Sequence, residues 1–132
     1  MKFLLDTDTC IYALKQNVSV LEHLLAHSRT DVGLSVITEA ELRTGAAKSR
    51  AAGRTLRLIE NFLRPLGIVE FTSIDAASYA QVRAKLERAG TPIGPLDTLI
   101  AAQAVARKLV LVSNNEREFS RVAGLRIENW TS

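Results

Sequence analysis

Short runs of consecutive apolar residues alternate along the chain with longer segments in which apolar residues recur every three or four positions. A continuous apolar run is typical of a strand buried on both faces, and the wider spacing is typical of a helix with one buried face. The runs predict strands at 2–5, 32–36, 67–71 and 109–112, with a short edge strand at 126–127. Because strands and helices alternate, we expect an α/β fold with a mainly parallel central sheet and helices on both faces.

The helical segments begin at residues that commonly cap helices. We expect helices over 8–14, 18–26, a segment that opens at 38, 55–63, 75–89, 96–106 and 116–119. Asp8 and Asp75 are suitable N-caps, and Thr38 is followed three residues later by Glu41, which is the spacing of a capping box. Residues 96–106 are apolar on nearly every face, so this helix is expected to be central and buried.

Composition narrows the class of protein. The chain has 132 residues, 47% hydrophobic and 23% charged, which is ordinary for a single globular domain over 1–132. Its one cysteine, Cys10, excludes an internal disulfide and fits a reducing, cytoplasmic compartment. We expect neither a membrane span nor a signal peptide, because no apolar stretch is long enough and Asp6 and Asp8 interrupt the first one. The net charge of +3 is compatible with nucleic acid, whereas 5% aromatic residues disfavour a base-stacking platform.

Polar side chains follow the predicted strands. Asp6 ends the first strand, Glu41 lies one turn into the helix after the second, and Asp97 lies in the first turn of the most buried helix. Asn115 and Glu118 follow the strand at 109–112. The carboxyl ends of parallel strands meet at one edge of the sheet, where such proteins bind ligands, so we expect these groups to converge.

Converging carboxylates repel one another and stay ionised only if a cation offsets them. Oxygen ligands suit Mg²⁺ or Mn²⁺, and such an ion can orient a water and bind a phosphoryl oxygen. The leading interpretation is therefore metal-assisted phosphodiester hydrolysis. Taken singly, each acid has an ordinary alternative: Asp6 as a cap, Glu41 as the capping-box partner of Thr38, Asp97 at a helix dipole, and Glu118 as a solvated acid.

Basic residues recur over residues 43–64, where Arg43, Lys48 and Arg50 are candidates for contact with an RNA backbone. A solvated helix face is an equal alternative for this segment.

Other candidates are weaker. His23 and His27 have the spacing of two zinc ligands on one helix face, but no third ligand accompanies them, so a surface pair is favoured. Cys10 lacks a recognisable base and is expected to be a small buried residue. Trp130 is expected to be a packing anchor.

Four segments occur together and in order: LLDTDTCIYALK, SVITEAELRTGAAKS, AGTPIGPLDTLIAAQA and LVLVSNNEREFSRVAGLRIENW. In this combination the chain resembles PIN-domain ribonucleases, and most closely the VapC-type toxins of bacterial toxin–antitoxin pairs. The resemblance covers nearly the whole chain. It implies a small α/β domain whose acidic site uses Mg²⁺ or Mn²⁺ to cleave RNA.

The resemblance also implies roles for particular residues. Asp6 and Asp97 would be the main metal ligands, and Glu41 would complete the catalytic cluster directly or through water. A fourth acidic position of the family falls on Asn115, with Glu118 nearby. Further candidates at the site are Thr7 and Ser113.

The partners implied by the resemblance are a cognate VapB-type antitoxin and an RNA substrate, with no membrane. Such toxins are typically homodimers held inactive in a hetero-oligomer with the antitoxin, through which alone promoter DNA is bound. The expected targets are structured RNAs, such as tRNA or ribosomal RNA loops. With water as the nucleophile, the products would carry 5′-phosphate and 3′-hydroxyl ends.

Two alternatives remain open from the residues. Residues 6–9 read Asp-Thr-Asp-Thr, which matches the opening motif of haloacid-dehalogenase phosphatases and would make Asp6 a covalent nucleophile. Against it, no paired late aspartates follow a strand, and the other three segments go unexplained. The second alternative is a non-catalytic RNA- or protein-binding module on the same fold.

Overall fold

A computed structural model describes all 132 residues. Its elements, in chain order, are β1 (Phe3–Leu5), α1 (Thr7–Leu14), α2 (Val18–Ala26), the 3-10 helix η1 (Arg29–Asp31), β2 (Val32–Ser35), α3 (Val36–Lys48), α4 (Ala52–Leu63), β3 (Gly67–Val69), α5 (Ser73–Arg88), α6 (Pro95–Arg107), β4 (Val110–Val112), α7 (Glu116–Phe119) and β5 (Arg126–Glu128). None of the helices has the length and apolar character that crossing a bilayer requires.

The five strands form one parallel sheet in the order β3-β2-β1-β4-β5. The central strand β1 pairs with β2 on one side and with β4 on the other, and the last residue of β1, Leu5, is in register with Leu34 and Val112. The carboxyl ends of these three strands therefore lie next to one another. This arrangement confirms the predicted parallel α/β sheet and makes the edge beyond β1 the place where a ligand site is expected.

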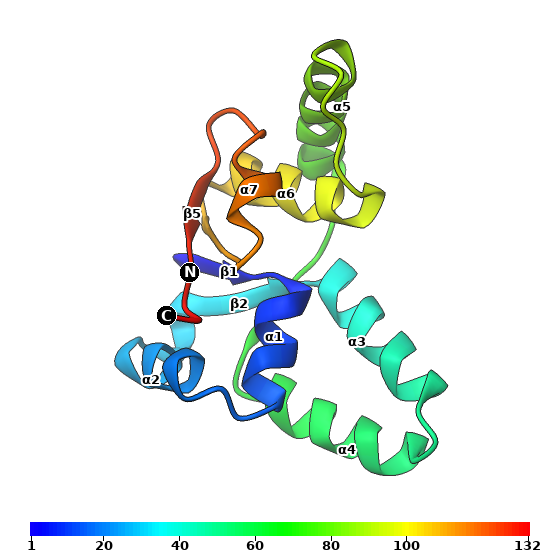
Figure 1. Cartoon of the computed structure of the whole chain (residues 1–132), viewed down its shortest axis with the longest axis vertical. Helices are drawn as coiled ribbons and strands as arrows, with labels where there is room; N and C mark the ends of the chain where they lie inside the picture. The colour runs from blue at the N-terminus through cyan, green and yellow to red at the C-terminus, as the bar shows by residue number, and fades with distance from the viewer.

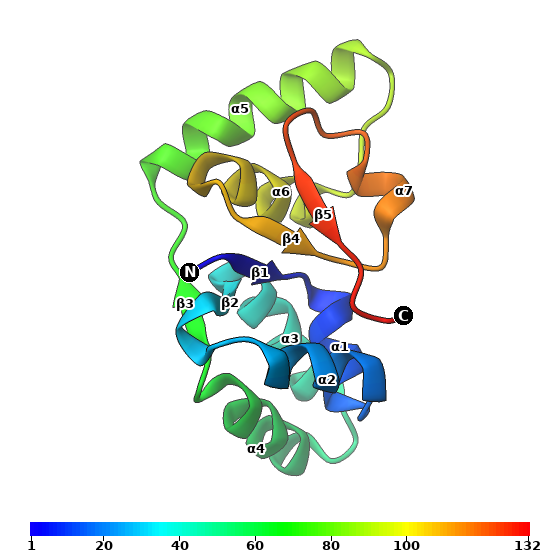
Figure 2. The same cartoon turned by 90° about the vertical axis from the view of Figure 1, so that its left-hand side faces the viewer.

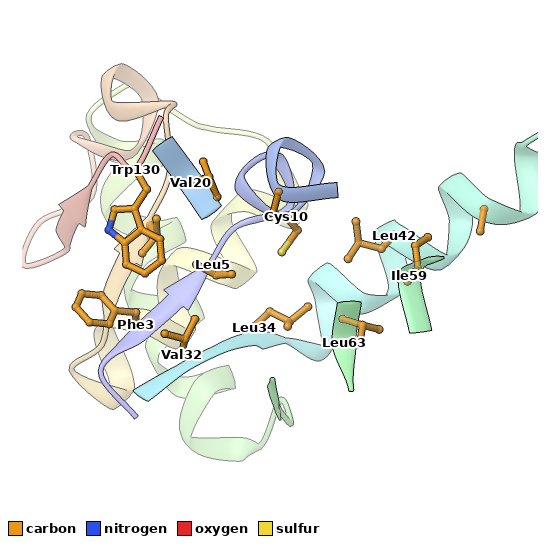
Figure 3. Packing of buried hydrophobic residues seen from close by; sticks show 13 residues of the cluster. Phe3, Leu5, Cys10, Val20, Val32, Leu34, Leu42, Ile59, Leu63 and Trp130 are labelled. Atoms are coloured by element: carbon orange, nitrogen blue, oxygen red, sulfur yellow. The ribbon is translucent and has the colours of Figure 1, made fainter. Parts of the chain in front are cut away.

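Helices lie on both faces of the sheet (Figures 1 and 2). A separate hydrophobic core packs against each face. Side chains alternate along β1, so Phe3 and Leu5 enter one core and Leu4 the other. Helices α1 to α4 cover the first core, and α5, α6 and α7 cover the second. Figure 3 shows the first core, with Trp130 against Phe3 near the start of β1. Their ring centroids are 5.3 Å apart.

Trp130 is 1% exposed, which confirms the predicted packing anchor. The rings of His23 and His27 each stack on its indole, with centroids 5.3 Å away. The interpretation of these histidines as a plain surface pair is therefore wrong, because both are half-buried against Trp130. Their shared helix face is occupied by an aromatic ring rather than by further metal ligands.

Cys10 is fully buried, as predicted.

Three helix starts differ from the sequence-based expectation, and at α1 and α3 the reason is that the chain turns from strand to helix with almost no loop. Asp6 rather than Asp8 caps α1, with an extended backbone (φ −77°, ψ 172°). Ser35 caps α3, so Thr38 lies inside this helix rather than at its start. Thr72 caps α5, and Asp75 is its capping-box partner rather than the cap. Helix α4 also begins earlier than predicted, at Ala52.

Strand β3 ends at Val69, two residues earlier than predicted, because it pairs only with β2, which itself ends at Ser35. The next carbonyl, that of Glu70, instead accepts a hydrogen bond of 2.9 Å from the Gln103 side chain of α6.

Candidate active site

Asp6 lies at the centre of the edge formed by the carboxyl ends of β1 and β4. Its backbone N–H donates to the Val112 carbonyl at 3.0 Å, which continues the strand pairing by one residue. Asp6 is 3% exposed, and its carboxylate accepts a hydrogen bond from the Thr9 backbone N–H at 2.8 Å. Burial raises the pKa of Asp6 above its usual range, while hydrogen bonds from Ser113 and Thr9 oppose the rise. The Asp6 carboxylate is therefore held in a fixed position with some of its oxygen lone pairs already used.

Ser113 follows β4 and is completely buried beside Asp6. Its hydroxyl oxygen accepts a hydrogen bond from the Asn115 N–H at 2.9 Å, and its own N–H donates to the Glu128 carbonyl at 2.9 Å. The structure therefore places Ser113 against the site, where it orients Asp6 and shapes the turn that carries Asn115.

Glu41 is fixed by α1 and not by its own helix. The Thr7 hydroxyl donates to Glu41 Oε1 at 2.6 Å, and it also lies 3.4 Å from the buried hydroxyl of Thr38. The capping-box interpretation of Thr38 and Glu41 is therefore wrong. Thr38 supports the site from inside α3, and Glu41 points from α3 toward the start of α1.

Asp97 lies in the first turn of α6 and is half-buried. Its pKa is raised from 3.8 to about 6, first by burial and then by the negative charges of Glu118, Asp6, Glu41 and Asp8. Because charges act at short range through a partly desolvated medium, this shift means that the four acids face a common region around Asp97. No side chain or backbone group of the protein donates a hydrogen bond to the Asp97 carboxylate.

Glu118 joins α7 to the loop before α6. One of its oxygens accepts a hydrogen bond from the Gly94 N–H at 3.0 Å, and the other accepts from the Asn115 side-chain amide. A Cβ placed on Gly94 would lie 3.6 Å from an Asp97 carboxylate oxygen and 4.0 Å from one of Glu118, so this glycine separates the two acids. The interpretation of Glu118 as a solvated surface acid is wrong, and Asn115 serves as a donor to it.

The oxygen donors at this edge suit Mg²⁺ or Mn²⁺, since carboxylate, hydroxyl and amide groups gather there and both imidazoles lie elsewhere, against Trp130. Asp97 is a half-buried carboxylate that accepts no hydrogen bond and lies among other negative charges. A divalent cation bound there would offset the repulsion between these charges. No three His, Cys, Asp or Glu side chains lie close enough together to form a ready-made ligand set. The acids therefore share one region, but Glu41 and Glu118 accept hydrogen bonds from the chain, Glu41 from Thr7 and Glu118 from Gly94.

The basic candidates are not brought to this edge. Arg43 is bound to Glu39 at 2.9 Å and lies 3.9 Å from Glu60. Lys48 and Arg50 are exposed at the far end of the hairpin of α3 and α4, which extends away from the sheet in Figure 1.

Two supporting residues of the site were not predicted as part of it, namely Thr9 and Gly94. The Gly94-Pro95 pair before a buried helix was the available signal for a loop that must bring an acid to the sheet edge. Thr9 gave none, because a buried threonine inside a helix has no distinctive spacing.

This parallel sheet with its acidic carboxyl edge matches a known family. The family model for the PIN domain matches residues 3–125, and the chain therefore belongs to the PIN-domain family. Within that family the chain groups with the VapC proteins. It is 42% identical over 130 residues to the tRNA(fMet)-specific endonuclease VapC of Salmonella typhimurium, covering 98% of each chain. It is 38% identical over 131 residues to the tRNA(fMet)-specific endonuclease VapC of Shigella flexneri, covering 99% of each.

A solved structure has the same architecture. The crystal structure of DNA-bound VapBC from Salmonella typhimurium contains a chain that superposes with a TM-score of 0.95 at 42% identity, covering 98% of each chain. The comparisons confirm the resemblance drawn from the four sequence segments, and the match over nearly the full length confirms the fold class.

Proposed function

We propose that the protein is an endoribonuclease toxin of a toxin–antitoxin pair, which hydrolyses phosphodiester bonds in structured RNA. The observation that carries the proposal is the gathering of Asp6, Glu41, Asp97 and Glu118 at the carboxyl edge of the sheet, where burial and then the neighbouring negative charges raise the pKa of Asp97 to about 6. Family membership supports the same chemistry, because relatives of 42% and 38% identity are named tRNA endonucleases. Transfer RNA is therefore the first substrate to examine.

Asp6 and Asp97 would hold Mg²⁺ or Mn²⁺, with Glu41 bound directly or through a water. Such an ion, when bound, lowers the pKa of a water and offsets charge that develops on the phosphoryl group. The chain positions these carboxylates in advance. Thr7 holds Glu41 at 2.6 Å, and the Thr9 N–H holds Asp6 at 2.8 Å.

We expect water, rather than a ribose hydroxyl, to be the nucleophile, because a divalent cation held by these carboxylates would orient a water and lower its pKa. Attack of water on phosphorus with departure of the 3′-oxygen leaves a 5′-phosphate and a 3′-hydroxyl. We expect these ends on the products, and 2′,3′-cyclic phosphate ends would contradict the proposal.

The test is cleavage of purified tRNA by the parent protein and by Asp6→Asn and Asp97→Asn variants, with Glu22→Gln, an exposed acid of α2, as the control. We expect cleavage to require Mg²⁺ or Mn²⁺, to stop in EDTA, and to fall at least a hundredfold in both site variants. Cleavage that persists in EDTA, or an Asp6→Asn variant as fast as the parent, would refute the metal assignment. Turnover of p-nitrophenyl phosphate with RNA left intact would favour the phosphatase alternative.

We also propose a VapB-type antitoxin as partner, as in the VapBC complex from Salmonella typhimurium. An apolar cavity of about 490 Å³ lies between α1, α3 and α4, lined by Ile11, Leu42, Leu58 and Phe62 among others. Glu41 also lines this cavity, so a protein segment seated there would reach the acidic site. We expect the antitoxin to block cleavage and to supply all promoter DNA binding, and tight DNA binding by the toxin alone would contradict this.

A further inference from the structure

A polar pocket lies between α1 and the turn after β4, close in the chain to Asp6 and Ser113 of the acidic site. It has a volume of about 290 Å³ and is lined by Asp8, Ile11, Tyr12, Lys15 and Asn114. Its volume lies just below the range for small-ligand pockets, about 300–1,000 Å³, and suits one flexible nucleotide better than a base pair.

The pocket is joined to the site through the chain itself. Asn114 lies between Ser113, which binds Asp6, and Asn115, which binds Glu118. On the other wall, Asp8 lies two residues from Asp6, and its negative charge acts on Asp97. An RNA strand with its scissile phosphate at the acids would therefore place a flanking nucleotide beside these walls.

The polar groups of the pocket are positioned and only partly used. The Asn114 side-chain N–H donates to the Tyr12 hydroxyl at 3.0 Å, which links two residues far apart in the sequence. This bond leaves the Asn114 carbonyl oxygen as an acceptor and the Tyr12 O–H as a donor. The Tyr12 ring itself packs against the first core, so the hydroxyl is anchored. Side chains of this kind read the edges of unstacked bases in RNA.

Lys15 supplies the positive charge that this side of the site needs. Phosphates that approach Asp6, Asp8, Asp97 and Glu118 meet repulsion, and Lys15 forms no ion pair that would occupy its ammonium group. By contrast, Arg43 is already bound to Glu39. Lys15 is thus available for a phosphate contact at the mouth of the pocket.

We propose that the pocket of Asp8, Tyr12, Lys15 and Asn114 binds one RNA nucleotide next to the cleaved bond, with Lys15 on a phosphate and Asn114 and Tyr12 on the edge of the base. This inference rests on the proposed ribonuclease function and adds a determinant of which bond is cut. The four residues position the substrate and take no part in the chemical step.

The test compares Tyr12→Phe, Asn114→Ala and Lys15→Gln with two matched controls. Tyr79→Phe removes the hydroxyl of the other tyrosine, on α5, and Lys2→Gln removes an exposed lysine before β1, at the opposite edge of the sheet. The substrate is a short RNA hairpin that the parent cleaves at one bond, together with its versions carrying each base at the flanking positions.

We expect KM to rise about fivefold to tenfold in each of the three variants, the effect of one lost hydrogen bond or phosphate contact, with kcat within about threefold of the parent. We also expect Tyr12→Phe and Asn114→Ala to lose base preference at a single flanking position. A purely structural role would instead lower cleavage of all the RNAs alike. If KM and base preference match those of the controls while the parent cleaves RNA, the inference is wrong.

A second measurement distinguishes failure of the pocket from failure of the proposed ribonuclease function. It is equilibrium binding of the same hairpin, measured by fluorescence anisotropy with all proteins in an Asp97→Asn background. RNA binding that weakens in the three variants supports the pocket even if no protein cleaves, a result that would contradict only the proposed function. Binding that none of the three changes overturns the inference. So does a loss of antitoxin binding with RNA affinity unchanged, which would assign the pocket to a protein partner.

Discussion

Replacing Asp97 by Asn should stabilise the metal-free protein while it abolishes cleavage. The folded-state pKa of Asp97 is raised from 3.8 to about 6, by burial first and then by Glu118, Asp6, Glu41 and Asp8. A carboxyl group whose folded pKa lies above its unfolded value favours the folded state in its protonated form. Its contribution is complete below about pH 4 and is lost as the pH rises through about 6.

The magnitude follows from the size of that rise. A difference of about two in pKa, at about 1.4 kcal/mol for each, gives an upper bound of about 3 kcal/mol. Asp97 is only half-buried, so solvent screening reduces this value, and we expect about 1 kcal/mol. Asparagine has nearly the shape of aspartate and no charge, so the variant does not have the free-energy cost of a buried negative charge at any pH.

The assay is urea unfolding in EDTA at several values between about pH 4 and about pH 8. The unfolding free energy of Asp97→Asn should match the parent at the acidic end and exceed it by about 1 kcal/mol at the alkaline end. Glu22→Gln, which makes the same change in net charge on exposed α2, should show no such trend. A variant less stable than the parent at alkaline pH, or a difference that does not change with pH, would refute the electrostatic reasoning.

Three further predictions follow from the same structure. Thr7→Val should lower RNA cleavage about tenfold, because Glu41 loses its 2.6 Å hydrogen bond, and cleavage assays with Mn²⁺ varied should show part of this loss recovered at high concentration. Mn²⁺ should raise the melting temperature of the parent and not that of Asp97→Asn, as checked by calorimetry, and an equal rise in both would place the ion elsewhere. Trp130→Ala should cost about 3–5 kcal/mol of unfolding free energy in urea melts, because a fully buried indole and its stacking contacts are lost.

The sheet was predictable because its signal is local. The inner strands β1 and β4 are continuous apolar runs, and the inner strands of such a parallel sheet are buried on both faces, so the pattern marks both the elements and their class. The strand ends were predicted less well. β2 ends at Ser35 because this residue already caps α3, a choice that depends on how closely α3 follows the strand.

The acids of the site were predictable in position but not in their bonding. Placing Asp6, Glu41 and Asp97 near one edge needed only the expectation that the strands are parallel, because their carboxyl ends then meet at one edge of the sheet. That Glu41 is held by Thr7, 34 positions away in the sequence, depends on how α1 and α3 pack. The same holds for Glu118, whose partner Gly94 is 24 positions away. Contacts between residues so far apart produce no pattern of spacing or periodicity. Interpreting each acid singly, as a helix cap or a surface acid, was therefore as consistent with the sequence as a role in the site.

The bonding separates the acids into two kinds with different consequences. Asp6, Glu41 and Glu118 each accept hydrogen bonds from fixed groups of the chain, although burial still raises the pKa of Asp6. Asp97 has no such donor and carries the pKa of about 6. Near neutral pH, the proton state of Asp97 is therefore the one most open to change by a bound cation, and cation binding should release about half a proton at about pH 6 and very few at about pH 8. Calorimetric titration of Mn²⁺ in buffers of different ionisation enthalpy measures this number directly. A proton release that does not depend on pH would mean that Asp97 is not the group that the cation neutralises.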